Sequence, residues 1–592
     1  MSTFFGLNIG KTGLYAYKAA LDTTAHNIAN TETEGYSRQV INQKAGNALR
    51  VNSSYGMAGT GVVISDVYQL RDEYYDIKYR NNNTLYGEYS YKNHYMAEIE
   101  NYFNEIKLEG FSETFDSMFD SIHELVKDPA SEAVRSQVAN FAKSLTEHFN
   151  SLSTNLKDSQ EECNFEIKNM VDKTNSIAQQ LSALTRQINT LEVKGGSAND
   201  LRDQRALLVD ELSQIVNVSV TERVVGDGIG VTSYVVKIDN QTLVDSGEYN
   251  SLHLIPRAEK LNQNDVDGLY DIAWANGQIF DLGSPSLGGA LQALYEVRDG
   301  NNNYNLSGTI SLTEETAEGT FVTLSEANIN EVEKLNIPQT GILTISNREY
   351  VYTEFELTEN DGEFEYKFKL EKSLVVDAMG AQASIGKAIN YKGIPYYMGQ
   401  MNQFIRTFSK AFNDIHRSGV DLNGNPAIDF FNGRDKVSGE NYTFGIGEDT
   451  EGFDSYYLMT AENFTVSDEL MSDWTKIATG SNVIDGIEEN DVVDALLGLK
   501  TDKSAFDRGQ PGSFMNTLVA EIGIDTKKAN NFAEGQDNIL KAITNQRLSI
   551  SGVDIDEEAM SLVRFQNAYN LSAKVISVMD EIYDRLINYM GV

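Results

Sequence analysis

The residues that could support catalysis or bind a metal are few and scattered along the chain. No two of the six histidines have the spacing of a zinc site such as His-Glu-x-x-His, and one cysteine forms neither an intrachain disulfide nor a thiolate cluster. Carboxylates are so abundant, at a net charge of −39, that pairs of them carry no information about acid–base catalysis. We therefore expect no enzyme, no cofactor and no metal site. The residues concerned are His26, His94, His123, His148, His253, His416 and Cys163.

Loops that bind phosphate or calcium are not predicted either. The glycine-rich segments 56–61 and 226–230 do not match the dinucleotide-binding pattern between a strand and a helix, so we interpret them as turns. Asp421 begins a stretch that resembles a calcium loop, but Pro426 stands where an EF-hand needs glycine. That stretch is also predicted to be a turn.

Composition and charge exclude further classes of protein. The 592 residues include 48 Lys and Arg against 87 Asp and Glu, and 41% are hydrophobic. Roughly four domains are expected from this length. Nucleic acid and anionic lipid are excluded as partners because the carboxylates would repel their phosphates. Insertion into a membrane is not expected, since no apolar run approaches about 18 residues. Lys11 and Lys18 interrupt the N-terminal apolar stretch, so no cleaved signal peptide is predicted.

Both ends of the chain can hold long helices, since no proline precedes Pro129 or follows Pro511. At the N-terminus, apolar residues recur every seven positions within a helix predicted over about 4–30. Near the C-terminus, one apolar stripe follows a 3-4 alternation and a second runs beside it, which predicts burial on more than one side. The residues predicted to form these assembly helices are Leu7, Leu14, Leu21, Ile28, Leu562, Phe565, Tyr569, Ile576, Met579, Tyr583 and Leu586; the second stripe is Ala568, Leu571, Val575, Val578, Ile582 and Tyr589.

The middle of the chain divides by hydrophobic period. A period near 3.6 predicts helices over about 80–216, from Pro395, and over about 484–500 and 511–548. A period of two begins near 217, where Asn276-Gly277 predicts a hairpin with a type I′ turn. The clearest strand is predicted over 363–370. The elements therefore occur in the order helix, helix, strand, helix, helix, which indicates nested domains with both termini at one end.

Two short segments resemble a known family. The segment after the first helix, and the one that opens the last helix, are similar to the terminal signatures of the bacterial flagellar rod, hook and hook-associated axial proteins, and Gly35 to Gln39 are closest to the hook-associated protein 1 branch. Weaker support comes from 199–205, 287–289 and 412–422, which occur in the family's order. The motif residues are Asn27, Ile28, Ala29, Asn30, Gly35, Tyr36, Ser37, Arg38, Gly552, Val553, Asp556, Glu557 and Glu558.

The resemblance implies a structural protein of the flagellum, an adaptor that joins hook to filament and self-assembles through its terminal helices. Its partners would be copies of itself in a ring or helical layer, the hook protein, the next hook-associated junction protein, and an export chaperone at the C-terminal helix. It would lie outside the cell, exported by the flagellar type III route. The fold expected is α+β multidomain: a terminal coiled-coil pair (1–45 with 550–592), a mainly helical-bundle domain with hairpins near 217–282 (46–300 with 391–549), and an inserted β-rich outer domain (301–390).

The nesting also predicts how the terminal helices pair. They should be antiparallel, with Leu7 near Leu586 and Leu14 near 579–583. Asn27 and Asn30 are predicted to end the first helix and redirect the chain, and Arg38 to pair with an acidic neighbour.

Three alternatives remain open. An ordinary intramolecular helix pair would also explain the two terminal stripes. The hook protein itself would have a mostly β middle. An extracellular adhesin or binding module would place its activity in 301–390.

Overall fold

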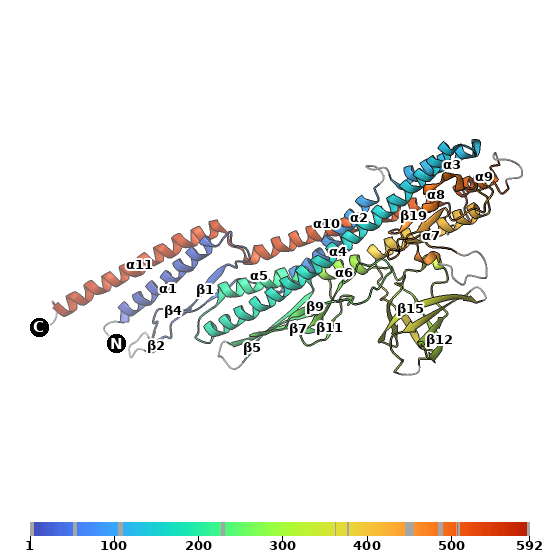
Figure 1. Cartoon of the computed structure of the whole chain (residues 1–592). Coiled ribbons are helices and arrows are strands. Elements are labelled where there is room, and N and C mark those ends of the chain that lie inside the picture. The colour runs from blue at the N-terminus through green and yellow to red at the C-terminus, as the bar shows by residue number, and fades with distance from the viewer. Residues whose placement is uncertain are drawn as a thin grey trace.

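The molecule is elongated, with both chain ends at one tip and a small β-rich body projecting near the other (Figure 1). The structure, a computed structural model, describes residues 5–50, 56–104, 110–225, 231–360, 363–375, 378–444, 455–482, 489–504, 506 and 509–588. Helices and sheets both contribute large parts of it, so the predicted α+β multidomain fold class is confirmed.

The two terminal helices lie side by side at the tip (Figure 1). Helix α1 spans Phe5–Ala29 and helix α11 spans Ile555–Asn588, so both predicted terminal helices are confirmed. The Asp554 carboxylate accepts the backbone N–H groups of Asp556 and Glu557 and thereby caps α11. An antiparallel ribbon packs along α1; it consists of β1 (Gln39–Ala45) paired with β4 (Val62–Gln69), and β2 (Leu49–Arg50) paired with β3 (Met57–Ala58). We call α1, α11 and this ribbon the terminal rod.

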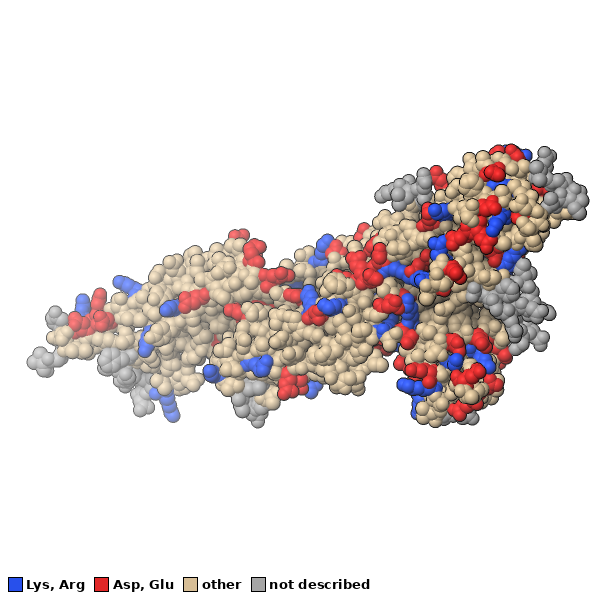
Figure 2. Space-filling model, in the orientation of Figure 1, with Lys and Arg blue, Asp and Glu red and all other residues tan. Residues whose placement is uncertain are grey.

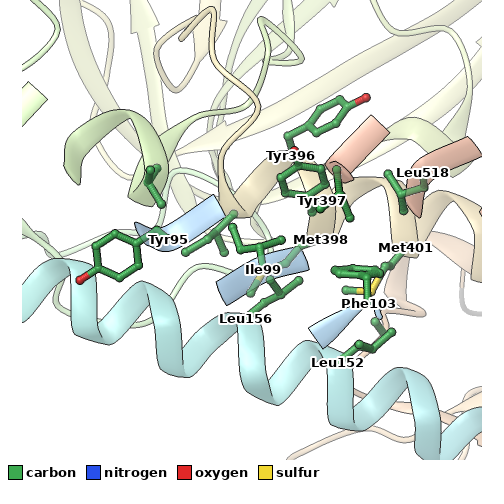
Figure 3. Close-up of a cluster of buried hydrophobic side chains, with 14 of the residues drawn as sticks. Tyr95, Ile99, Phe103, Leu152, Leu156, Tyr396, Tyr397, Met398, Met401 and Leu518 are labelled. Atoms are coloured by element: carbon green, nitrogen blue, oxygen red, sulfur yellow. The ribbon is translucent and has the colours of Figure 1, made fainter. Parts of the chain in front are cut away.

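Long helices build the main body, as predicted for 80–216 and for the segments after 395 and 511. Helix α4 alone would be about 90 Å long at 1.5 Å per residue. Helices α2, α4, α7 and α10 bring Tyr95, Leu156, Tyr397 and Leu518 into one apolar core (Figure 3). The helices are α2 (Glu73–Tyr102), α3 (Phe111–Lys127), α4 (Glu132–Glu192), α5 (Asn199–Ile215), α6 (Gly289–Asp299), α7 (Ile394–Arg417), α8 (Asp468–Ser472), α9 (Asp491–Leu499) and α10 (Pro511–Ser551), with short 3-10 turns η1 (Val332–Lys334), η2 (Tyr456–Leu458) and η3 (Trp474–Lys476).

Small sheets pack against these helices. The predicted hairpin exists, since Ile272 pairs with Phe280, but its turn type was predicted wrongly. A type I′ turn needs positive φ at both central residues, and of Asn276 and Gly277 only Gly277 (φ 84°) has it. The loop is longer, because Trp274 N–H donates to the Gln278 carbonyl. The strands are β5 (Val218–Val225), β6 (Val231–Ile238), β7 (Gln241–Asp245), β8 (Glu248–Tyr249), β9 (Leu252–Pro256), β10 (Tyr270–Trp274), β11 (Ile279–Phe280), β18 (Phe431–Gly433) and β19 (Phe464–Val466).

Six strands between Ser307 and Ile385 close into a barrel in the order β12-β13-β16-β15-β14-β17. The predicted strand over 363–370 is confirmed as β16, which pairs with β15 from Asn360↔Glu363 onward. The barrel has its own apolar core. The chain enters and leaves it at one place, where Asn302 N–H donates to the Tyr391 carbonyl at 2.9 Å. The strands are β12 (Ser307–Thr316), β13 (Gly319–Ser325), β14 (Gly341–Ile345), β15 (Arg348–Asn360), β16 (Glu363–Leu370) and β17 (Gln382–Ile385).

Candidate functional site

Helices α1 and α11 pack along a row of small residues on α1. A methyl group added to Gly10 would lie 2.9 Å from Ile576 Cγ1, one added to Gly13 would lie 3.0 Å from Ser572 Oγ, and one added to Gly6 would overlap Met579. Ala16, Ala20, Thr24 and Asn27 are buried along the rest of α1. These small side chains let the two helices approach closely.

The contacts confirm the antiparallel direction but correct the predicted register. Gly6 faces Met579, whereas Leu7 was expected to lie near Leu586, so the pairing is displaced by about two turns. The prediction assumed that the leucine row of α1 forms the seam. The seam is the glycine row instead, because a close helix contact excludes large side chains.

The predicted assembly residues fall into two groups. The half-buried positions, of which Ile576 and Met579 approach the glycine row of α1, are Leu7, Leu14, Leu21, Ile28, Leu562, Phe565, Tyr569, Ile576, Met579 and Tyr583. Leu586 is exposed instead, at 46%.

Most of the second stripe of α11 is exposed; of the other predicted members, Ala568 is half-buried and Tyr589 lies outside the described residues. Leu571 is 67% exposed, and Val575, Val578 and Ile582 are each more than 40% exposed. Met560 and Val563 extend this row towards the start of the helix. We call these six residues the outer stripe. Along the terminal rod, Figure 2 shows mostly uncharged surface, whereas charged groups are dense at the opposite end of the molecule.

The end of α1 is fastened by a buried amide. Asn27 Nδ2 donates to the Gln39 carbonyl at 2.9 Å, and its Oδ1 accepts from Gln39 N–H at 3.0 Å and from the Tyr36 hydroxyl at 2.8 Å. Asn30 Nδ2 donates to the His26 carbonyl at 2.9 Å, which caps the helix. Gly35 has φ 76°, so it supplies the left-handed conformation of the turn.

The same turn is tied to the start of α11. Arg38 Nε donates to Glu558 at 2.6 Å, Arg38 Nη1 donates to Glu557 at 3.1 Å, and Arg38 N–H donates to the Ser551 carbonyl at 2.8 Å. The predicted acidic partner of Arg38 is therefore identified. Burial opposes the charged guanidinium, but these two carboxylates raise the pKa of Arg38 above its ordinary value.

Further ion pairs connect the turn to the main body. Ser37 N–H donates to Asp203 at 3.0 Å, and Arg71 bridges Asp203 and Asp76. Arg547, near the end of α10, bridges Asp76 at 2.8 Å and Asp210 at 2.6 Å. Burial raises the pKa of Asp203, and the Ser37 N–H opposes that rise. We call this region, residues 30–38, 71–80, 199–210 and 547–558, the joint.

The structure brings the two family motifs together at the joint. Asn27, Ser37 and Glu558 are buried there, and Ile28, Asn30, Gly35, Tyr36, Arg38, Gly552 and Val553 are half-buried. Ala29, Asp556 and Glu557 are exposed.

Sequence reasoning missed the residues on the body side of the joint. Asp203 lies in a motif that supported only the resemblance, and Asp76, Asp210 and Arg547 lie in no motif at all. The glycine row was detectable, because Gly6, Gly10, Gly13, Ala20, Thr24 and Asn27 follow the 3-4 spacing of a helix seam.

The described residues contain no group of three or more His, Cys, Asp or Glu placed to hold a metal ion. In the part of the chain that the structure describes, no helix has the length and apolar character needed to cross a membrane.

Comparisons with known proteins identify similar sequences. The family model "Flagellar hook-associated protein FlgK helical domain" matches residues 96–318 and 341–431, more than half of the chain. The model "Flagellar basal body rod FlgEFG protein C-terminal" matches 544–589.

Flagellar hook-associated protein 1 of Bacillus subtilis is 28% identical over all of this chain and 99% of its own length. The Escherichia coli protein of that name is 28% identical over 98% of this chain and 99% of its own. The flagellar hook junction protein of Burkholderia pseudomallei has a similar structure (TM-score 0.47, 14% identity, 80% of this chain and 100% of that one). The chain belongs to the flagellar hook-associated protein 1 family.

Proposed function

We propose that this protein is a structural subunit that joins the flagellar hook to the filament and assembles with copies of itself through the terminal rod. The observation that carries the proposal is the outer stripe, an exposed row on α11 that is apolar except at Asn567 and that the described residues leave largely uncovered. Burial releases about 25 cal/mol per Å² of apolar surface, so contact between copies would stabilise the assembly. The role is structural rather than catalytic.

A substitution on the outer stripe tests this role. Leu571→Asp with Val578→Asp should leave the fold intact, because both side chains are exposed, but should block incorporation into flagella. Bacteria with this variant should keep their hooks and secrete filament subunits into the medium. Asn570→Asp with Ser577→Asp adds the same charge at exposed polar positions of α11 that lie off the outer stripe, and this variant should assemble normally. Normal flagella with the stripe variant would contradict the proposal.

Export through the flagellar type III channel, without a cleaved signal peptide, is part of the same proposal. Before assembly, an export chaperone would cover the outer stripe, since exposed apolar rows favour aggregation. Deletion of 560–590 should abolish binding to the chaperone in a pull-down. Retained affinity would remove the chaperone from the proposal.

We also propose three domains: 1–69 with 550–592, 70–300 with 391–549, and 301–390. The first extends beyond the predicted residue 45, because β4 pairs with β1. The separate core of the barrel supports the last of them. The helical-domain family model leaves out 319–340 but takes in most of the barrel. The mainly helical body favours the junction protein over a hook protein, and no observation favours an adhesin.

A further inference from the structure

Lys11 and Lys18, which interrupt the leucine row, have no role in the α1–α11 seam. Both are exposed on the face of α1 opposite the glycine row, and Tyr15 lies between them with 59% of its surface exposed. Residues four and three apart share a helix face, so the three side chains form one ridge. Lys11 Nζ lies 5.6 Å from the centre of the Tyr15 ring. Neither lysine has an ion-pair partner among the described residues. We call these three residues the basic ridge.

The joint contains a groove of about 730 Å³ with the opposite character. Its lining includes the apolar side chains of Leu207, Leu548 and Ile550, of which Leu548 is 54% exposed. Its rim carries Glu32 and Glu34, both exposed and without an ion-pair partner in the described chain. Arg38 and Arg547 also line it, but their charges are already matched by Glu557, Glu558, Asp76 and Asp210. We call this hollow the joint groove.

We propose that the basic ridge of one copy docks in the joint groove of a second copy. The ridge offers an aromatic ring between two lysines without ion-pair partners, and the lining of the groove offers apolar side chains together with two carboxylates without ion-pair partners. At a net charge of −39, most surfaces of this chain would be repelled by the groove, whereas the ridge presents two exposed lysines without an ion-pair partner among the described residues. The inference rests on the proposed self-assembly and names its contact.

The basic ridge lies near the middle of α1, whereas the joint groove lies beyond the C-terminal end of this helix, so the contact would be heterologous. From Tyr15, α1 continues for 14 residues to Ala29, which is roughly 21 Å along the helix axis. The second copy would therefore be shifted along the rod by about this distance. Heterologous contacts repeat from copy to copy and generate rings or helical layers rather than closed dimers.

Cross-linking in isolated flagella tests this contact. A chain with Tyr15→Cys and Ile550→Cys should form disulfide-linked ladders after mild oxidation, since each copy carries one cysteine in its basic ridge and one in its joint groove. A link within one chain is excluded, because a disulfide needs Cα atoms within about 7 Å. The native Cys163 is buried. Tyr15→Cys with Phe141→Cys, an exposed site on α4, should give no ladder.

Charge reversal gives an independent readout. Lys11→Glu with Lys18→Glu, and separately Glu32→Lys with Glu34→Lys, should each lower the copies per flagellum about tenfold, and the quadruple variant should recover most of them. Lys143→Glu with Lys168→Glu adds the same charge on α4 and should change nothing. The inference is overturned if the Tyr15→Cys, Ile550→Cys variant is present in flagella at normal amounts without a ladder. It is also overturned if the quadruple charge-reversal variant reaches no more copies per flagellum than the two double variants. If the unmodified chain is missing from flagella, the proposed function fails and the inference fails with it.

Discussion

Arg38 and Arg434 each form ion pairs, but their surroundings differ. The carboxylate of Glu558 is buried and only 3% of its side-chain surface is exposed, whereas Arg434 and Asp468 are both about half exposed. Water screens an exposed pair and leaves it worth about 0–1 kcal/mol. A buried carboxylate that loses its partner costs several kcal/mol, since its charge stays desolvated. At the scale of single residues, burial therefore decides which ion pairs hold the joint.

Arg38→Ala should weaken the attachment of the turn to α11 by about 3 kcal/mol, because Glu558 would remain buried without its partner. Arg434→Ala breaks the matched exposed pair and should lower the free energy of unfolding by less than about 1 kcal/mol. Hydrogen exchange of the first turns of α11 measures the first effect, and urea unfolding measures both. Equal effects of the two substitutions would contradict this account.

His416 predicts a pH dependence. Its ring is fully buried, Nδ1–H donates to the Ile428 carbonyl at 2.7 Å, and Nε2 accepts from Ala478 N–H at 2.9 Å. Burial lowers its pKa to about 4, and Arg135 and Arg417 add to the effect. The unfolded chain therefore binds the proton first, so stability is complete above about pH 6.5 and falls as the pH drops towards 4.

Over this range the His416 contribution should approach about 1 kcal/mol per pH unit. The free energy of unfolding in urea, measured from pH 7 to pH 4, should fall less steeply in His416→Gln than in the unmodified chain. Parallel pH profiles of the two proteins would show that His416 is not the group responsible.

At the scale of elements, glycines set how closely the helices approach. A methyl group on Gly87 of α2 would overlap the backbone carbonyl of Gln214 in α5, which cannot move aside like a flexible side chain. Gly535 of α10 has nothing within 4 Å of the same position. An added methyl group therefore has no space at Gly87 but has open space at Gly535.

Gly87→Ala should lower the free energy of unfolding by more than about 2 kcal/mol, because α2 and α5 must separate. Gly535→Ala should raise it by about 0.5–1 kcal/mol, since alanine restricts the unfolded chain and favours helix. Thermal and urea unfolding of the two variants provide the comparison. Stabilisation by both would mean that α2 and α5 do not pack as closely as described.

At the scale of the whole molecule, one buried guanidinium joins the barrel to the helical body. Arg406 of α7 donates to the carbonyls of Leu335 at 2.6 Å, of Met459 at 2.8 Å and of Tyr457 at 2.7 Å. Leu335 and Tyr457 belong to the barrel core. Burial lowers the pKa of Arg406 to about 10, so it remains charged at neutral pH.

Arg406→Met should uncouple the two parts, because these carbonyls would be left without donors. Calorimetry should then resolve separate transitions for the barrel and the body. Lys410 is an exposed cation on the same helix, and its Nζ lies 3.2 Å from the Glu333 carboxylate. Lys410→Met should therefore leave the barrel and the body unfolding in one transition. An unchanged profile for Arg406→Met would show that other contacts join the barrel to the body.

The sequence by itself determined the elements that local periodicity encodes. The terminal helices, the helical body and the strand at 363–370 followed from spacing, since repeats of 3.6 and two residues reflect how each element buries one face. The family signatures also marked Asn27 and Arg38 before their contacts were known.

Only the tertiary structure decided the register of α1 on α11 and the body side of the joint. The leucine row and the glycine row of α1 have equal periodicity, and only the approach of Met579 and Ile576 shows which one forms the seam. Asp76, Asp203, Asp210 and Arg547 come from three helices far apart in the chain. Their pairing depends on the distances between elements, and local periodicity carries no information about those distances.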